Sequence, residues 1–404
     1  MLLYRLLMMV LAGGMVGKLC LRRDWTTLGD RLGRSGPKDG VARLWIHAAS
    51  NGELGSVKPV IDALIADGWH VLITVNTPSA RDMAIRWALP HTDIRLAPVD
   101  LPHVVQRMFR AWTVTAYITV ETDVWPQRIL TCPGPVLVLG GRLTERSAKG
   151  WARFAALTAR VLDRVDYLSA QDAASQTRFR KLGLRDAATG PVFDLKALYT
   201  PPEMPVPADL EDQFDRHSTW LAASTHAGEE AVILDAHKRA RDSVPQLKLI
   251  LAPRHPKRGD DIADLIEASG LSYARRSKGT PPDTADVYLA DTFGEMPIWY
   301  QLAGTTFIAG SLSDRGGHTP YEPAAFASAL LHGPDVHNFR AAYGRLQDHD
   351  AAIMISSADA LAKGVVALSD PAKQAQMGQA AQAALRQDTD LETLLRDINT
   401  ALGA

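Results

Sequence analysis

The sequence is poor in cysteine and carries almost no net charge. Its 404 residues include two cysteines, and the formal net charge is −1. Two cysteines as far apart as Cys20 and Cys132 are too few for a disulfide scaffold or a metal site, and they favour a reducing compartment. The balanced charge offers no argument for binding nucleic acid, and we expect no such partner.

Long apolar runs are also scarce, and only one segment has the composition of a membrane segment. It starts at the N-terminus and reaches Gly17 with one charge, Arg5, which is short for a span of about 20 apolar residues. The basic residues Lys18, Arg22 and Arg23 follow it, and positive charge there favours keeping the rest of the chain in the cytoplasm. We therefore expect an uncleaved N-terminal anchor with a basic juxtamembrane segment over residues 1–35. It would span the bilayer or lie in its interface, and a cleaved signal peptide is the competing interpretation.

Beyond the leader the chain has a globular composition, with 46% hydrophobic and 22% charged residues. Short apolar runs alternate with helical patterns, which predicts a parallel α/β sheet. The runs expected as strands are 41–46, 70–77, 94–99, 115–120, 136–139 and 167–170.

A proline-rich break at 199–208 divides the chain, because clustered prolines fit neither a helix nor a central strand. The α/β pattern then restarts, with helices expected at 229–241, 260–269 and 371–402. We predict an α/β domain at 36–198, a linker at 199–208 and a second α/β domain with C-terminal helices at 209–404, and the cleft between them is the default ligand site. Strands of the second domain are expected at 220–223, 247–252, 287–289, 305–309 and 329–332.

Two acidic residues follow predicted strands of the first domain. Glu53 comes after the strand 41–46, at the start of a helix, where free N–H groups favour an ionised carboxylate that can act as a general base. The alternative is a glutamate that only complements the helix dipole. Glu121 follows the strand 115–120 and belongs to the same sheet edge. The pair Glu121 and Asp123 can be interpreted as a metal motif, but no histidine or further acid cluster accompanies it, so we expect no metal.

In the second domain, several loops after strands carry candidate nucleotide contacts. Arg254 offers a planar fork that suits phosphate, unless it is a solvated surface arginine. Gly294 and the glycine-rich loop 310–317 let an anion approach the backbone at a helix start. Glu322 can accept hydrogen bonds from ribose hydroxyls or complement a helix dipole. His226 follows another strand, and a structural histidine is an equally good interpretation.

The order of these motifs resembles the 3-deoxy-D-manno-octulosonic acid (Kdo) transferases of lipopolysaccharide synthesis, from the leader to about residue 345. The Glu-Thr-x-x-Trp-Pro element at 121–126 and the Gly-Gly-His-x-Pro-x-Glu element at 316–322 are the most specific. The other elements of the resemblance are 47–53, the turn at 77–78, and the segments 141–147, 224–226, 253–256 and 291–295.

This resemblance implies a fold, an activity and site residues. The fold would be GT-B, with two Rossmann-like α/β domains facing a central cleft and an N-terminal membrane anchor. The enzyme would invert the anomeric centre while moving Kdo from CMP-Kdo to a lipid A precursor at the cytoplasmic face of the inner membrane, whose anionic lipids would attract the leader. It would need no cofactor or metal. Glu53 matches the general base and Glu121 the acid assigned to transition-state stabilisation, and CMP would be held by Pro253, Arg254, Phe293, Gly294, Glu295, Thr319, Pro320, Tyr321 and Glu322.

One departure from the family pattern concerns a lysine. The family has Gly-Ser-Leu-Lys-Phe-Asp where residues 190–194 read Gly-Pro-Val-Phe-Asp, and Lys196 lies nearby but out of register. Two other hypotheses therefore stand beside Kdo transfer: a GT-B enzyme that uses another CMP- or UDP-activated sugar, and a catalytically silent member that binds the lipid precursor.

Overall fold

The computed structural model describes residues 2–34, 36–37, 39–386 and 391–403, and it divides into two compact units. The first unit is Met1–Leu198 with Gln387–Ala404, and the second is Tyr199–Arg386. The division therefore falls at the start of the proline-rich stretch. The predicted end of the anchor at residue 35 lies outside the described residues.

The first unit is built on a sheet of seven parallel strands in the order β3-β2-β1-β4-β5-β6-β7. Side chains along the central strand β1 alternate between two cores, with Leu44 and Ile46 in one and Trp45 in the other. Burial on both faces explains why such strands are continuous apolar runs. The strands are β1 (Arg43–Ala48), β2 (His70–Val75), β3 (Thr92–Leu96), β4 (Val114–Val120), β5 (Val136–Gly141), β6 (Tyr167–Ala170) and β7 (Thr189–Val192).

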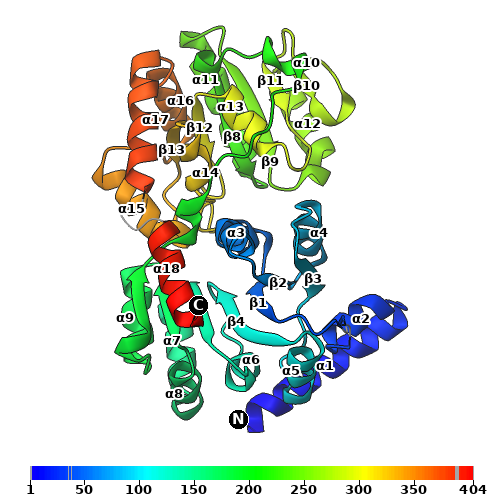
Figure 1. Ribbon diagram of the computed structural model, residues 1–404. Helices are drawn as coiled ribbons and strands as arrows, with labels where there is room; N and C mark the ends of the chain where they lie inside the picture. The colour runs from blue at the N-terminus through cyan, green and yellow to red at the C-terminus, as the bar shows by residue number, and fades with distance from the viewer. Residues whose placement is uncertain (1, 35, 38, 387–390, 404) are drawn as a thin grey trace. The chain divides into compact units, whose positions relative to one another are not determined.

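Helices lie against both faces of this sheet (Figure 1). Several begin at side-chain caps: Ser50 caps α3 and Thr144 caps α7, each by accepting a backbone N–H. The helices between the strands are α3 (Asn51–Ala66), α4 (Pro78–Arg86), α5 (Pro102–Ala111), α6 (Pro126–Thr131), α7 (Glu145–Ala152), α8 (Ala155–Asp163) and α9 (Ala173–Lys181).

The second unit repeats this architecture, with a parallel sheet in the order β10-β11-β9-β8-β12-β13-β14. Its strands are β8 (Thr219–Thr225), β9 (Lys248–Pro253), β10 (Tyr273–Arg275), β11 (Val287–Leu289), β12 (Thr305–Ile308), β13 (Ala329–His332) and β14 (Ala352–Met354). Its helices are α10 (Ala208–Glu211), α11 (Glu229–Ser243), α12 (Gly259–Ala268), α13 (Met296–Leu302), α14 (Tyr321–Ala325), α15 (Arg340–Asp348), α16 (Ala358–Ala367) and α17 (Pro371–Leu385).

The leader forms one helix, α1 (Leu2–Leu21), followed by α2 (Trp25–Arg31). At 20 residues α1 is longer than the sequence pattern predicted, and its segment Tyr4–Leu21 is long and apolar enough to cross a membrane. One face of α1 packs on the first unit: Met8 and Ala12 contact the α5 region, and the Tyr4 hydroxyl donates to Asp100 Oδ2 at 2.5 Å. Apolar side chains on its other face are exposed, namely Leu6, Leu7, Met9, Val10 and Leu11.

The last helix, α18 (Leu391–Leu402), packs on the first unit (Figure 1). Leu394 and Ile398 are fully buried in the core that also holds β1 and α3. The Tyr167 hydroxyl also donates to Asp397 Oδ2 at 3.1 Å. The prediction that all C-terminal helices belong to the second domain is therefore wrong for α18, because its apolar face completes the core of the first.

Ile398→Ala should destabilise the first unit by about 2–5 kcal/mol, since it opens a cavity in a closed core. Chemical denaturation followed by tryptophan fluorescence would measure this loss. Arg396→Ala, on the exposed side of the same helix, is the matched control and should change stability by less than about 0.5 kcal/mol. Equal stabilities of Ile398→Ala and wild type would mean that α18 does not pack on this core.

Candidate active site

Glu53 lies in the first turn of α3, at the carboxyl end of the central strand β1. Its Oε2 accepts the Ala49 backbone N–H at 2.6 Å, and its own N–H donates to the cap residue Ser50 at 3.3 Å. Glu53 is buried, at 9% exposure, and its Oε1 has no hydrogen-bond partner among the described residues. One carboxylate oxygen thus fixes the side chain, and the other is left for a ligand.

Glu121 follows β4, the strand next to β1, so its carboxylate shares a sheet edge with Glu53. Its backbone is in the left-handed region with φ of +51°, which strains a residue other than glycine by about 1–3 kcal/mol. The strained backbone is held by the Glu121 N–H, which donates to Leu139 O at 3.0 Å, and by the Arg142 N–H, which donates to Glu121 O at 3.1 Å. The Glu121 carboxylate pairs with the Lys196 ammonium, which comes from the segment after β7. Strain of this kind is typical of functional sites.

A third carboxylate, Asp123, is held by a hydrogen-bond relay. Trp45 Nε1–H donates to Thr74 Oγ1 at 2.7 Å, and Thr74 Oγ1 lies 2.9 Å from His47 Nδ1. His47 Nε2 lies 2.8 Å from Asp123 Oδ2, which also accepts from Asn76 Nδ2 at 2.9 Å. Burial lowers the pKa of His47 to about 4, so the ring is neutral at pH 7. The Thr74 carbonyl oxygen lies 3.0 Å from Nδ1, so each ring nitrogen of His47 faces an oxygen that only accepts.

The pKa values of Glu53 and Asp123 diverge because their surroundings differ. Burial raises the pKa of Glu53 to about 8, and the nearby Glu121 and Asp123 charges add to this effect. Lys196 and the Ala49 N–H oppose it. Burial would also raise the pKa of Asp123, but its hydrogen bonds with His47 and Trp125 and the charge of Arg128 together lower the value to about 2. Glu53 is thus partly protonated near neutral pH while Asp123 stays ionised. Two neighbouring acids with such different pKa values are typical of acid–base sites.

Lys196 is out of register with the lysine of the family pattern, but its ammonium group pairs with the Glu121 carboxylate, 75 residues away in the sequence. The expectation that no histidine accompanies Glu121 and Asp123 is wrong, because His47 contacts Asp123 directly. Both ring nitrogens of His47 are engaged within the protein, Nε2 with Asp123 and Nδ1 with Thr74.

In the second unit, all predicted nucleotide contacts follow four neighbouring strands, β11, β9, β8 and β12. Because parallel strands end at one edge, the loops carrying these residues lie along the same edge of the sheet. They are Phe293, Gly294 and Glu295 after β11, Pro253 and Arg254 at the end of β9, His226 after β8, and Thr319, Pro320, Tyr321 and Glu322 after β12.

The glycine-rich loop after β12 does not offer the free N–H groups that the sequence predicted. The backbone N–H groups of Gly310, Ser311 and Leu312 donate to the buried Glu229 carboxylate at 2.9–3.2 Å. The Gly316 N–H donates to Asp335 Oδ2 at 2.7 Å, and those of Gly317 and His318 donate to backbone carbonyls. An internal carboxylate already occupies this ring of amides, so the prediction that they bind a phosphate is wrong.

Positive charge is nevertheless concentrated at this edge. Arg254 is exposed, and its guanidinium makes no hydrogen bond or ion pair with the described residues. His226 Nε2 lies 2.9 Å from His318 Nε2, and burial lowers the pKa of each to about 4, with Arg254 contributing in both cases. Arg315 acts on His226 in the same way. Two arginines thus supply the charge here while the histidine pair remains neutral.

Other predicted contacts have partners of their own. The Glu295 carboxylate pairs with Arg276 at 2.8 Å and accepts from the Thr292 hydroxyl. Burial raises the pKa of Glu322, which hydrogen bonds with Tyr300 and feels the charge of Arg254. The Tyr321 hydroxyl accepts from Arg345 at 2.5 Å, whereas Phe293 is 77% exposed beside Gly294, whose φ is +85°. Among these predicted CMP contacts, the charge of Arg254 acts on Glu322. The role of the predicted contacts in binding CMP stays a prediction.

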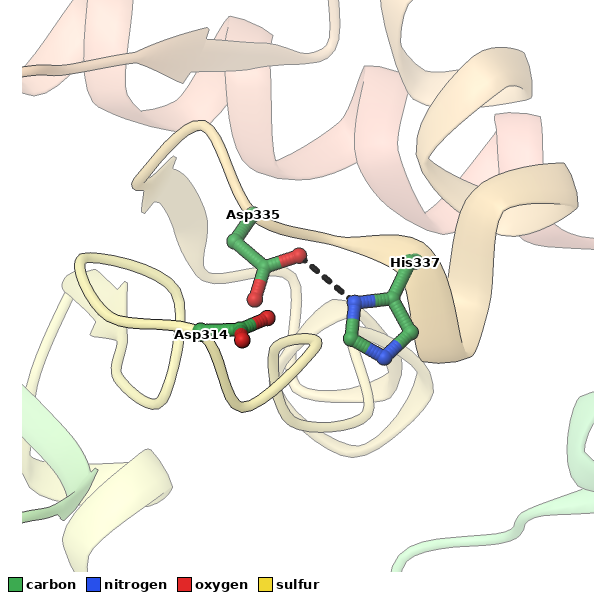
Figure 2. A group of neighbouring side chains, drawn as sticks. All are labelled: Asp314, Asp335 and His337. Atoms are coloured by element: carbon green, nitrogen blue, oxygen red, sulfur yellow. Dashed lines mark hydrogen bonds and ion pairs between the residues drawn. The ribbon is translucent and has the colours of Figure 1, made fainter.

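A separate acidic group lies on neighbouring loops of the second unit. Figure 2 shows Asp314, Asp335 and His337, whose ligand atoms lie within 4.8 Å of one another. Asp335 Oδ1 pairs with His337 Nδ1 at 2.7 Å, and Oδ2 accepts the Gly316 N–H. Both oxygens of Asp335 are thus engaged within the protein, where they hold two loops together.

Comparison with known proteins supports one family. A family model described as 3-deoxy-D-manno-octulosonic-acid transferase (kdotransferase) matches residues 26–198. The 3-deoxy-D-manno-octulosonic acid transferase of Haemophilus influenzae is 30% identical over 335 residues, which are 80% of this chain and 78% of the relative. That of Bordetella pertussis is 30% identical over 383 residues, which are 87% and 86% of the two chains.

The structure of UDP-GlcNAc 2-epimerase from Neisseria meningitidis aligns with a TM-score of 0.58 at 10% identity, covering 88% of this chain and all of that one. At this identity the likeness concerns the fold alone. Together with the two seven-stranded parallel sheets, it confirms the predicted GT-B class.

Glu53 should make the protein less stable as the pH rises. Its folded-state pKa of about 8 lies above the ordinary glutamate value of 4.5, so folding favours the protonated form. The stabilisation is complete below pH 4.5 and is lost as the pH rises through about 8. Glu53→Gln, which keeps the shape without the charge, should gain melting temperature over wild type between pH 6 and pH 9. Glu392→Gln at an exposed site is the control, and a constant difference between Glu53→Gln and wild type would contradict the raised pKa.

Lys196→Met should leave the buried Glu121 carboxylate without its cation and destabilise the protein by about 3–5 kcal/mol. Removing the Glu121 charge as well, in the double variant Glu121→Gln/Lys196→Met, should recover most of the lost stability. A double-mutant cycle by denaturant unfolding measures the coupling, with Lys196→Arg as the variant that keeps the charge. Additive effects of the two substitutions would argue against the ion pair.

Proposed function

We propose that this chain, which belongs to the 3-deoxy-D-manno-octulosonic acid (Kdo) transferase family, moves Kdo from CMP-Kdo to a hydroxyl group of a lipid A precursor. The chain is a glycosyltransferase, and its relatives support Kdo as the sugar. The identity of the donor nucleotide, the lipid acceptor and the roles of individual residues are the parts that the proposal adds.

The observation that carries the mechanism is the environment of Glu53. A general base works best when its pKa lies near the working pH, and burial raises the pKa of Glu53 to about 8. The Ala49 N–H fixes one oxygen of the carboxylate, and the other has no partner among the described residues. In the reaction, Glu53 takes the proton of the attacking hydroxyl as the new C–O bond forms. The bond between the sugar and the CMP phosphate breaks on the opposite side, which inverts the anomeric centre.

The neighbouring acids serve the same step without taking the proton. The carboxylates of Glu121 and Asp123 would stabilise the positive charge that develops on the sugar ring as the leaving group departs. Lys196 would prevent Glu121 from raising the pKa of Glu53 further, since it pairs with Glu121 and lowers the pKa of Glu53. A substrate carboxylate, which Kdo carries, would also be attracted to this ammonium group.

On the donor side, the leaving CMP phosphate needs positive charge that is not already used within the protein. Arg254 fits this requirement, because its guanidinium is exposed and makes no ion pair with the described residues. Glu322, which feels the Arg254 charge, would accept from a ribose hydroxyl. The amides of Gly310, Ser311 and Leu312 are assigned no role, since Glu229 occupies them.

We place the protein at the cytoplasmic face of the inner membrane, where α1 is the attachment. The exposed apolar face of α1 suits a lipid surface, and Lys18, Arg22 and Arg23 suit anionic headgroups at about 1 kcal/mol per residue. The opposite face is packed on the first unit through Met8, Ala12 and the bond from Tyr4 to Asp100. This packing favours a helix that lies in the interface over one that leaves the domain to cross the bilayer.

A transfer assay in detergent tests the proposal, with CMP-Kdo generated in place and a tetra-acylated lipid A precursor as the acceptor. Wild type should form the product, and Glu53→Gln should lower kcat by about 10²–10⁴-fold because the base is gone. Glu392→Gln should behave like wild type. CMP should raise the melting temperature of wild type and Glu53→Gln equally. Binding of CMP without a product would point to another CMP-activated sugar or acceptor, and neither binding nor product would contradict the proposal.

A further inference from the structure

A pocket in the first unit opens directly beside the carboxylate cluster. Its rim includes Thr122, the residue after Glu121, and Arg142, whose N–H donates to the Glu121 carbonyl. Its walls come from the loop after β4 and from α7, α8 and α9, which lie side by side in Figure 1. The apolar side chains of the wall are Val124, Leu143, Trp151, Leu162, Phe179 and Leu182.

The polar groups of this pocket divide into an inner and an outer set. Inside, the Thr158 hydroxyl donates to the Trp151 carbonyl at 2.8 Å, so it presents no unpaired donor to a ligand. Outside, Thr144 and Ser147 are exposed and bond to each other at 3.0 Å. The pocket is therefore apolar in its depth and polar at its mouth, which is the pattern that an amphiphile requires.

The helix over the pocket is held by few contacts. None of the residues of α7 is buried, and Trp151, the large apolar residue that α7 gives to the pocket, is only half-buried. Phe154, directly after the helix, is 55% exposed. An element with so little buried surface can move at low cost, so a chain can enter beneath it.

Positive charge lies on the rim of the pocket and along the helix α7. Arg142 lies on its rim, and Arg146 and Arg153 are exposed on α7 and just after it. None of these three guanidinium groups makes an ion pair with another described residue. Arginines without internal partners next to an apolar pocket complement a ligand that carries both phosphate and hydrocarbon.

We infer that this pocket binds one acyl chain of the lipid acceptor, and that Arg142, Arg146 and Arg153 bind the acceptor's phosphate. The inference rests on the proposed function and adds how the acceptor is recognised. The pocket encloses about 80 Å³, which is smaller than the cavity of about 150 Å³ that holds a benzene ring. A polymethylene segment therefore fits better than a sugar or a base. A chain seated here would bring the hydroxyl groups of its glycolipid towards Glu121 and Glu53.

The test compares two acceptors, a tetra-acylated precursor and the same glycolipid after removal of its acyl chains. Wild type should have at least tenfold higher kcat/KM for the acylated acceptor. Ser147→Trp fills the mouth of the pocket while keeping the backbone cap of α7, and it should reduce this ratio towards one. Ala152→Trp adds the same bulk to an exposed position of α7 outside the pocket lining, and it should leave the ratio unchanged. A ratio in Ser147→Trp equal to that of wild type would overturn the inference.

A second readout does not depend on transfer and so separates this inference from the proposed function. Dibromostearoyl phosphatidic acid in detergent micelles should quench the fluorescence of Trp151, because bromine atoms on a bound chain would lie against the indole. The quenched fraction should fall in Trp151→Phe and in Ser147→Trp, but not in Trp87→Phe, which removes a half-buried tryptophan that packs against the other core of the first unit. Equal quenching in wild type and Trp151→Phe would contradict acyl-chain binding, whether or not the protein transfers Kdo.

Discussion

The first unit depends on keeping three carboxylates together at the edge of one sheet. Glu53, Glu121 and Asp123 follow the adjacent strands β1 and β4, and they are largely removed from water. Two like charges about 4 Å apart repel by about 4 kcal/mol at the effective dielectric of a protein surface. The protein meets this constraint with a different partner for each acid: a proton for Glu53, the Lys196 ammonium for Glu121, and the His47 ring for Asp123.

The surrounding structure explains how these partners stay in place. His47 cannot rotate freely, because it is buried within β1 and bonded at both ring nitrogens. Lys196 is carried by the segment after β7, an edge strand of the sheet, and it reaches Glu121 at the end of β4. The left-handed backbone of Glu121 is the strained point of this arrangement. Long-range packing, and not only the start of α3, therefore positions the Glu53 carboxylate.

Sequence reasoning predicted most strands of both sheets, because the central strands are buried on both faces and are continuous apolar runs. It missed β7, β10 and β14, which have three or four residues each at or near the sheet edges and lack such runs. It also placed Glu53 and Glu121 on one edge correctly, since both follow parallel strands. What it missed depends on contacts between distant residues: Lys196 with Glu121 across 75 positions, and Glu229 with Gly310 across 81. Nothing in the local pattern of a glycine-rich loop distinguishes a loop that binds phosphate from one that binds its own glutamate.

Burial beside two other acids keeps most of the Glu53 carboxyl protonated at neutral pH. Direct titration of this carboxyl group by carbon-13 NMR, with labelled glutamate and Glu53→Gln for assignment, measures this protonation. The titration midpoint of Glu53 should lie near pH 8. A midpoint near 4.5, the value for an unperturbed glutamate, would contradict it and leave Glu53 as a residue that only caps the helix.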